Sequence, residues 1–286
     1  MLQAQLYVFA WRYQGFQMWM YRKQKVISMD AELNQVDLAF VVDTTGSMGP
    51  LIRAARQQMV DMLRQLASAA DIRLQLGIVE YRDHPPQAKI VYRVYPFTAD
   101  LAQAQQTIES LQADEGGDAP EAVLDGIVAA CRELSWRPHA LRLLILVGDA
   151  PPHGVGSAGD SFAAGCPCGE TVLSVTRHAE EGRITIHALG LTSDTNASFG
   201  EISTLTGGRF FESKQAQKAI EHIAELLQME FAALELDRQV LAQYHDLSEL
   251  DVEALAQRLD VPYHVASNSL LRLLSRDLIE VPVLEA

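Results

Sequence analysis

From residue 36 onward, short runs of aliphatic and β-branched residues alternate with stretches of helical periodicity. This alternation is typical of βαβ units, in which helices cover both faces of a mainly parallel sheet. We therefore predict an α/β fold with a doubly wound, mainly parallel sheet over residues 36–232. The expected strands are 36–42, 72–81, 89–97, 141–147, 184–189 and 208–211, with the second and third paired antiparallel across the turn-rich segment 82–87. The expected helices are 49–69, 100–111, 120–134, 170–181 and 215–232.

The overall composition limits which classes of partner and which cellular compartment we expect. A formal net charge of -14 disfavours broad binding of a nucleic-acid backbone, because such binding needs clustered Lys and Arg. Three cysteines make no disulfide framework, which favours a reducing, cytoplasmic setting. The sequence has no run of about 18 apolar residues, and Arg12 interrupts the apolar stretch near the N-terminus. Neither a transmembrane helix nor a secretory signal is expected.

The N-terminal residues differ from the regular middle of the chain. Residues 1–28 combine alternating aromatic residues with Arg22, Lys23 and Lys25 and hold no acidic residue. One interpretation is an amphipathic segment that contacts a membrane surface or a partner. The interpretation we favour for residues 1–35 is a poorly ordered leader or a locally packed strand. Met29 is an alternative start, just ahead of the regular part.

Residues 237–286 form a separate pattern. A helical stripe over 252–259, a tight turn at 260–262, a second helix and a strand at 279–283 resemble a helix-turn-helix or winged-helix unit. Residues 233–286 carry ten acidic and four basic side chains, which repel DNA. A protein-interaction role is therefore favoured, and a DNA-binding regulator is kept as an alternative. The candidate base or phosphate contacts for that alternative are Tyr263, His264, Ser267, Asn268 and Arg272.

The chemistry-bearing motif lies between the first expected strand and the first helix, where residues 43–49 read Asp-Thr-Thr-Gly-Ser-Met-Gly. Ligands of such sheets bind where strand ends meet helix starts, at a switch in strand order. Asp43, Thr45 and Ser47 alternate, so one carboxylate and two hydroxyls can point at a common spot. Hard oxygen donors of this kind suit Mg²⁺ or a similar divalent ion.

Two further loops supply candidate ligands. Residues 116–121 read Gly-Gly-Asp-Ala-Pro-Glu, and residues 148–154 follow a buried strand as Gly-Asp-Ala-Pro-Pro-His-Gly. Both loops are expected at the same sheet edge as Asp43. A buried carboxylate without a partner is costly, so we expect Asp149 to pair with a cation, directly or through water.

Together these three loops resemble the metal-ion-dependent adhesion site (MIDAS) of von Willebrand factor type A (VWA) domains. The Asp-x-Ser-x-Ser motif of that family matches Asp43, Thr45 and Ser47, and its strand-end aspartate matches Asp149. The sequences of the two later loops are similar to those of a VWA subgroup found beside alpha-kinases and in hemicentin-like proteins. The resemblance covers residues 36–232. It implies a Rossmann-like VWA fold, a divalent cation (Mg²⁺, or Mn²⁺ or Ca²⁺) and a protein partner.

One position departs from the family pattern, because Asp118 stands where the middle loop usually has threonine. With Asp118 in the coordination sphere, three carboxylates would surround one doubly charged ion. Extra negative charge lowers the attraction of the cation for a carboxylate of the partner. The site is then expected to be weakly adhesive, to prefer a neutral partner group, or to hold the three loops together.

Enzymatic interpretations have less support in the sequence. Asp43 followed by Thr-Thr-Gly also fits a phosphorylated nucleophile, which would make the chain a metal-dependent hydrolase or phosphotransferase. Such enzymes need a lysine near the phosphoryl group, and only Lys89 and Lys214 lie near plausible loops. The Gly-Lys-Ser/Thr ending of a P-loop is missing. No Ser-His-Asp or Cys-His grouping is supported by more than the presence of those residues, so we assign no catalytic residue.

Several other residues are placed near the site or in loops of their own. The expected rim of the site consists of Asp83, His84, Glu121 and His153. Each histidine is expected to satisfy a loop hydrogen bond. Cys166 and Cys168 form a single Cys-Pro-Cys, which lacks the second ligand pair of a zinc motif, so a turn with reduced thiols is favoured even with His153 and His178 nearby. Cys131 is expected in the core.

Overall fold

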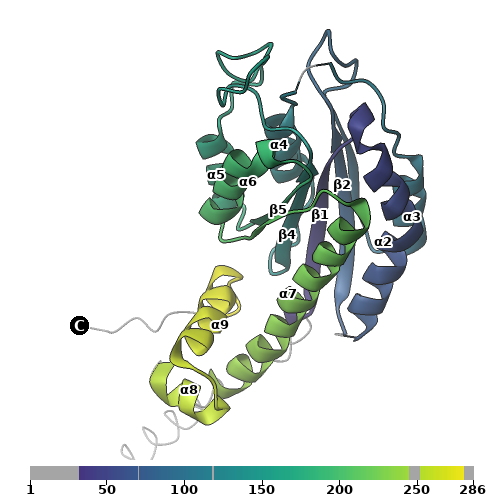
Figure 1. The fold of residues 1–286 in the computed structure, drawn as a ribbon. Helices are drawn as coiled ribbons and strands as arrows, with labels where there is room; N and C mark the ends of the chain where they lie inside the picture. Colours follow the sequence, from purple (N-terminus) through teal and green to yellow (C-terminus); the bar gives the residue numbers. More distant parts are fainter. Residues whose placement is uncertain (1–31, 70, 118, 245–251, 280–286) are drawn as a thin grey trace, which may run out of the picture. The chain divides into compact units, whose positions relative to one another are not determined.

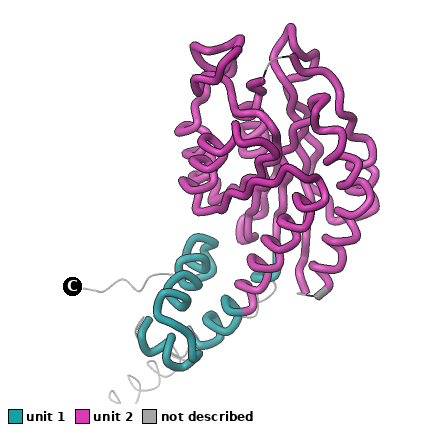
Figure 2. Tube along the Cα trace, in the orientation of Figure 1, with its two compact units in different colours: residues 1–35, 236–286 teal, residues 36–235 magenta. Residues whose placement is uncertain are grey.

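The computed structural model describes residues 32–69, 71–117, 119–244 and 252–279. By its internal contacts the chain divides into two compact units, one of residues 36–235 and one of residues 1–35 with 236–286 (Figure 2). The predicted leader lies almost entirely outside the described residues, as does Asp118.

The larger unit contains a six-stranded sheet with the order β3-β2-β1-β4-β5-β6 (Figure 1). The strands are β1 (Gln35–Asp43), β2 (Arg73–Tyr81), β3 (Tyr92–Thr98), β4 (Leu141–Gly148), β5 (Thr185–Gly190) and β6 (Phe210–Glu212). β1 and β4 pair parallel, as do β4 with β5 and β5 with β6, whereas β2 and β3 are antiparallel. The mainly parallel α/β sheet predicted from the sequence is confirmed.

Helices cover both faces of this sheet. The helices of the larger unit are α2 (Gly49–Ala69), α3 (Leu101–Ser110), α4 (Val123–Glu133), α5 (Val172–Glu181), α6 (Asn196–Leu205) and the first part of α7 (Ala216–Tyr244), with short 3-10 turns η1 (Gly46–Met48) and η2 (Ser193–Thr195). The part of α7 from residue 236 onward belongs to the smaller unit. α2, α3 and α7 contribute to one buried cluster, and α4, α5 and α6 contribute to the other. The strand order and these two layers form a doubly wound fold.

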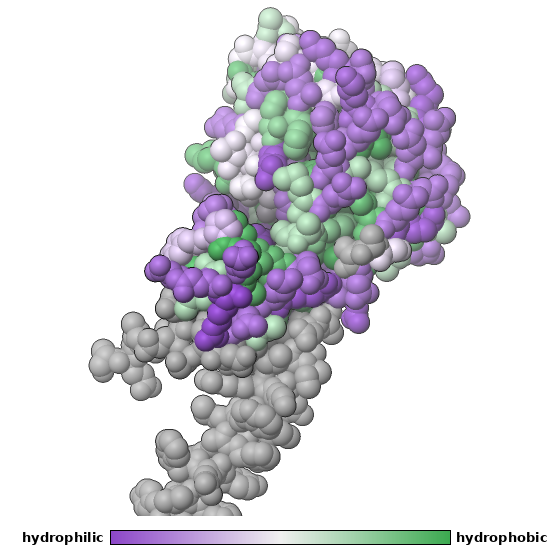
Figure 3. Space-filling model, turned by 60° about the horizontal axis from the view of Figure 1, so that its bottom comes forward, coloured by the Kyte–Doolittle hydropathy of each residue, from purple (hydrophilic) through white to green (hydrophobic). Residues whose placement is uncertain are grey.

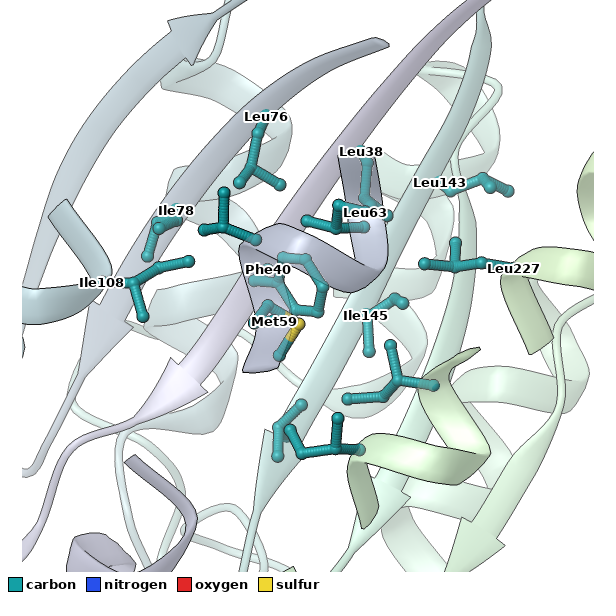
Figure 4. Packing of buried hydrophobic residues seen from close by; sticks show 14 of the residues in the cluster. Leu38, Phe40, Met59, Leu63, Leu76, Ile78, Ile108, Leu143, Ile145 and Leu227 are labelled. Atoms are coloured by element: carbon teal, nitrogen blue, oxygen red, sulfur yellow. The ribbon is translucent and has the colours of Figure 1, made fainter. Parts of the chain in front are cut away.

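The two cores follow from the two-residue period of the strands. In β1, Leu38 and Phe40 face the α2 side, and Ala39 and Val41 face the α4 side. Figure 4 shows Phe40 beside Met59 of α2, with aliphatic side chains of the neighbouring strands around them. Burial of both faces explains why β1 and β4 read as nearly continuous apolar runs.

Two features of the fold differ from the sequence prediction. α6 lies in a segment for which the sequence predicts no element, because its helical stripe is weak and two serines on it, Ser198 and Ser203, are buried. α7 does not end at residue 232 but continues to Tyr244, since Leu234, Val240 and Leu241 keep the apolar stripe going. The strand predicted at 279–283 lies outside the described residues, apart from Ile279.

The smaller unit contains α8 (Val252–Leu259) and α9 (Tyr263–Ser275), joined by the predicted tight turn. Its core includes Leu255, Leu270 and Leu273. Arg272 was a candidate DNA contact, but its guanidinium pairs with the buried carboxylate of Asp237 at 2.6 Å. This side chain therefore helps to hold the unit together.

The surface of the described residues is mixed in character. On the face drawn in Figure 3, hydrophilic residues cover much of the larger unit between smaller hydrophobic areas. Large exposed apolar side chains such as Val155, Leu173 and Leu205 lie in different segments, which are the loop after β4, α5 and α6. Within the described ranges, no helix has the length and apolar character needed to cross a membrane.

Candidate metal centre

The candidate centre lies where two neighbouring parallel strands end. Asp43 is the last residue of β1, and Asp149 directly follows β4. The register pairs Val42 with Val147, so the two aspartates leave the sheet side by side. From β1 the chain continues to β2 on one side, whereas β4 and β5 lie on the other side of β1. Such a switch in strand order usually forms a ligand site in open α/β sheets.

The loop after β1 gathers the three predicted oxygen donors around Asp43. Thr45 donates to Oδ1 of Asp43 twice, from its hydroxyl at 2.7 Å and from its backbone N–H at 2.8 Å. The hydroxyls of Thr45 and Ser47 are 3.4 Å apart. Asp43 and Thr45 are buried, while Ser47 is exposed. The loop therefore presents its oxygens from the protein interior toward solvent.

The second oxygen of Asp43 makes this arrangement electrostatically costly. Oδ2 is buried and receives no hydrogen bond from any part of the chain that the structure describes. Burial, together with the nearby carboxylate of Asp149, raises the pKa of Asp43 to about 7. An uncompensated buried carboxylate is destabilising, and a bound cation removes that cost. The residues present thus fit a divalent ion.

A phenol lies beneath the carboxylates. Tyr81 is fully buried at the end of β2, and its hydroxyl donates to the carbonyl of Val147 at 3.4 Å. Burial raises its pKa well above the usual value, and the negative charges of Asp43, Glu121 and Asp149 raise it further. These three carboxylates therefore act on one small region, which agrees with a site for positive charge.

Arg82 connects the loop after β1 to the loop that precedes α4. Its guanidinium donates to the Thr44 hydroxyl at 3.1 Å, to the Glu115 carboxylate at 3.1 Å and to the Gln112 carbonyl at 3.0 Å. Two backbone hydrogen bonds join the same loops, from Gly46 to Glu115 and from Asp114 to Thr44. The loop that leads to residue 118 is thereby fixed beside the candidate centre.

The structure divides the predicted rim into two groups. Glu121 is buried and bonds through its backbone to Pro151, so it lies with the loop that carries Asp149. Asp83, His84 and His153 instead form a second cluster. His153 lies between two carboxylates, with Nε2 at 2.7 Å from Asp83 and Nδ1 at 2.8 Å from Asp160. His153 therefore makes loop hydrogen bonds, as predicted.

Sequence reasoning missed three polar residues of this region, which are Arg82, Asp125 and Asp160. Asp125 carried a usable signal, because it stands in the apolar first turn of α4 and is only 8% exposed. A carboxylate at such a position needs a partner. Arg82 and Asp160 lie in polar loops and carried no comparable signal.

Comparison with known proteins gives the family. A model of the von Willebrand factor A domain matches residues 37–215. An alpha-protein kinase, vwkA of Dictyostelium discoideum, is 25% identical over 245 residues, which are 82% of this chain and 38% of that protein. A putative ariadne-like RING finger protein of Acanthamoeba polyphaga mimivirus is 31% identical over 128 residues, 45% of this chain and 12% of that protein. The chain thus spans well under half the length of either relative.

Solved structures agree on the fold. Proximal thread matrix protein 1 from the mussel byssus superimposes with a TM-score of 0.51 at 15% identity, over 69% of this chain and 46% of that one. Another structure of the mussel protein, also with a TM-score of 0.51, has a zinc-occupied MIDAS motif. The family match, the doubly wound sheet and the loops at its edge lead to one conclusion: the chain belongs to the von Willebrand factor A domain family.

Proposed function

We propose that residues 36–235 act as a metal-ion-dependent protein-interaction module. The predicted ligands are Asp43, Thr45, Ser47, Asp118 and Asp149, and water or an oxygen of the partner completes the shell. The observation that carries the proposal is the buried Oδ2 of Asp43, which receives no hydrogen bond from the described residues and lies near a second carboxylate. Asp118 enters this set from its sequence position alone.

The chemistry of the donors favours a hard cation. Carboxylate and hydroxyl oxygens suit Mg²⁺, and Mn²⁺ and Ca²⁺ are the alternatives. The mussel protein with zinc in its MIDAS supports a divalent ion at this position of the fold. Bound there, the ion would supply a positive charge that neutralises Asp43 and Asp149 and attracts an oxygen of the partner.

The exposure of the loop suits binding of a large partner. Gly46 and Ser47 are exposed, and Asp149 is partly exposed, while Asp43 and Thr45 lie beneath them. An ion held by the buried pair is then reachable from solvent on one side. Since the described residues arrange no nucleophile and base at this edge, we propose a binding role and no catalysis for this chain.

A capture experiment tests the proposal. The full chain is immobilised and exposed to extract in Mg²⁺ or in a chelator, and captured proteins are identified by mass spectrometry. We expect partners that appear only with Mg²⁺ and are lost with Asp43→Ala. Asp61→Ala is the matched control, because Asp61 is exposed on α2 and pairs with Arg64. Partners captured equally in chelator and by Asp43→Ala would contradict the proposal.

A further inference from the structure

A second group of metal-type ligands contains none of the residues predicted to form the MIDAS. The group consists of four side chains, which we call the thiol-histidine cluster: His84, Asp125, Cys166 and Cys168. They come from the loop after β2, from the first turn of α4 and from the long loop between β4 and α5. The last of these loops is drawn above α5, at the upper left of Figure 1. His84, Asp125 and Cys166 are each less than 9% exposed. Three segments far apart in sequence thus bring nitrogen, oxygen and sulfur together in the interior.

The distances within the cluster are short. Nε2 of His84 lies 3.2 Å from Oδ2 of Asp125 and 3.3 Å from Sγ of Cys166. Sγ of Cys166 lies 3.1 Å from the same Asp125 oxygen and 3.1 Å from Sγ of Cys168. In a tetrahedral zinc site, bonds of about 2.0–2.3 Å separate the ligand atoms by about 3.3–3.8 Å. The ligand atoms of His84, Asp125 and Cys166 all lie within 4.8 Å of one another, so these three need only a slight expansion to accept an ion at their centre. The exposed Cys168 lies beside Cys166 and would turn toward that ion as the fourth ligand.

Protons now occupy the positions that a cation would take. The Cys166 thiol donates to Asp125, and the Cys168 thiol donates to Cys166. The carboxylate of Asp125 thus lies beside a buried thiol and a buried imidazole in the interior. Zinc would displace the two thiol protons to solvent and leave both sulfurs as thiolates.

The surrounding groups hold the histidine ring in place. The ring of His84 packs edge-on against Phe162 at a centroid distance of 5.5 Å. The rings of His84 and His153 are 5.7 Å apart. His153 is fixed by Asp83 and Asp160, and Asp160 also accepts the backbone N–H groups of Gly154 and Phe162. Such outer partners orient the ligands of metal sites. Cys168 is the most exposed member and gives an ion a route from solvent.

We propose that the thiol-histidine cluster is a second metal site, which takes zinc through two sulfurs, one nitrogen and one oxygen. Soft thiolates select zinc over Mg²⁺, and four protein ligands make the closed coordination of a structural site. The position of the cluster between three segments suggests a structural role. Zinc here would fasten the long loop that begins at Asp149 to the loop after β2 and to the start of α4.

Cobalt provides the test, because Co²⁺ replaces zinc and its tetrahedral thiolate sites absorb light by sulfur-to-metal charge transfer. The MIDAS donors are all oxygens, so only the thiol-histidine cluster can give this absorption. The freshly reduced full chain is titrated with Co²⁺ and then with Zn²⁺, which should bleach the signal. We expect about one ion per chain with tetrahedral absorption. No charge-transfer absorption at saturating Co²⁺ would overturn the proposal.

Variants assign the ligands. We expect loss of the absorption in Cys166→Ser and in Cys168→Ser, the second of which changes an exposed residue and leaves the packed interior intact. Cys131→Ser is the matched control, since Cys131 lies on α4 outside the cluster, and Asp43→Ala tests independence from the MIDAS loop. Both should keep the signal. Absorption that persists in the folded Cys168→Ser and Cys166→Ser chains would also overturn the proposal.

Discussion

Thr45 directs both its hydroxyl and its backbone N–H at one oxygen of Asp43, at 2.7 Å and 2.8 Å, and leaves the other oxygen to the interior. The turn thereby orients the carboxylate without neutralising it. Asp149 follows the neighbouring strand β4 and adds a second negative charge. Burial, together with this charge, raises the pKa of Asp43. A divalent cation would neutralise the two carboxylates.

Replacing Asp43 with asparagine should stabilise the metal-free protein. A folded-state pKa near 7 means that stability is lost as the pH rises from the unfolded value of about 3.8 through 7. Asp43→Asn removes that charge at pH 8, and the gain is expected to be about 1–3 kcal/mol. The same variant should lose any stabilisation by Mg²⁺. Urea unfolding in chelator and in Mg²⁺ measures both effects, and an equal gain from Mg²⁺ in both proteins would contradict the prediction.

Replacing Arg82 with methionine should weaken cation binding, although Arg82 is no predicted ligand. The variant keeps the aliphatic stem but loses the hydrogen bonds to Thr44, Glu115 and Gln112. Outer groups that orient ligands typically change metal affinity by about 10–100-fold. Calorimetric titration with Mg²⁺ measures the change. Arg64→Met, on the exposed face of α2, is the control and should bind like the wild type; unchanged affinity in Arg82→Met would refute the proposed role.

Gly148 has no room for a side chain beneath the site. A Cβ there would approach the hydroxyl of Tyr81, whereas its next contacts, with Phe199 and Asp43, are at 3.3 Å and 3.5 Å. Gly148→Ala should therefore cost about 1–3 kcal/mol of unfolding free energy. Tyr81→Phe removes the clashing oxygen, so the double variant should recover most of that loss. Additive effects of the two substitutions in denaturant unfolding would show that this contact is not the cause.

His187 should make the fold sensitive to acid. Burial, helped by the charge of Arg209, lowers the pKa of His187 to about 4. The backbone N–H of Arg209 donates to Nδ1 at 3.1 Å, which fits a neutral ring. The Glu230 carboxylate, 3.7 Å from Nε2, opposes the shift, but it is partly exposed and does not outweigh burial. The contribution of the neutral His187 ring to the stability of the fold is complete above pH 6.5 and is lost as the pH falls toward 4.

The size of that loss is roughly 3 kcal/mol, because one pKa unit corresponds to about 1.4 kcal/mol. His187→Asn keeps an acceptor for the Arg209 N–H and removes the titrating group. Its unfolding free energy should therefore fall less between pH 7 and pH 4 than that of the wild type. Identical pH profiles from urea unfolding would show that His187 does not carry the acid sensitivity.

The sequence predicted the sheet well because both faces of β1 and β4 are buried and their apolar runs are unambiguous. The end of α7 was missed because the predicted helix stopped at residue 232, whereas the buried side chains of Leu234 and Val240 extend it to Tyr244. α6 was missed because it buries serines, which weakens an apolar stripe.

The MIDAS loop was predictable because its donors are adjacent in sequence and their spacing fixes their direction. The thiol-histidine cluster was not predictable in the same way. Cys166 and Cys168 are neighbours, but His84 and Asp125 reach them only through the packing of β2 and α4. Sequence proximity instead suggested His153 and His178. His153 pairs with Asp83 and Asp160, and His178 contacts Glu170.

Calorimetric titration of Mg²⁺ into the metal-free full chain tests the central claim most directly, with Asp43→Ala, Asp149→Asn and the exposed control Asp61→Ala beside the wild type. The account predicts binding of about one ion per chain in the wild type and the control, with loss of binding in both site variants. Equal Mg²⁺ affinity in Asp43→Ala and the wild type would contradict it.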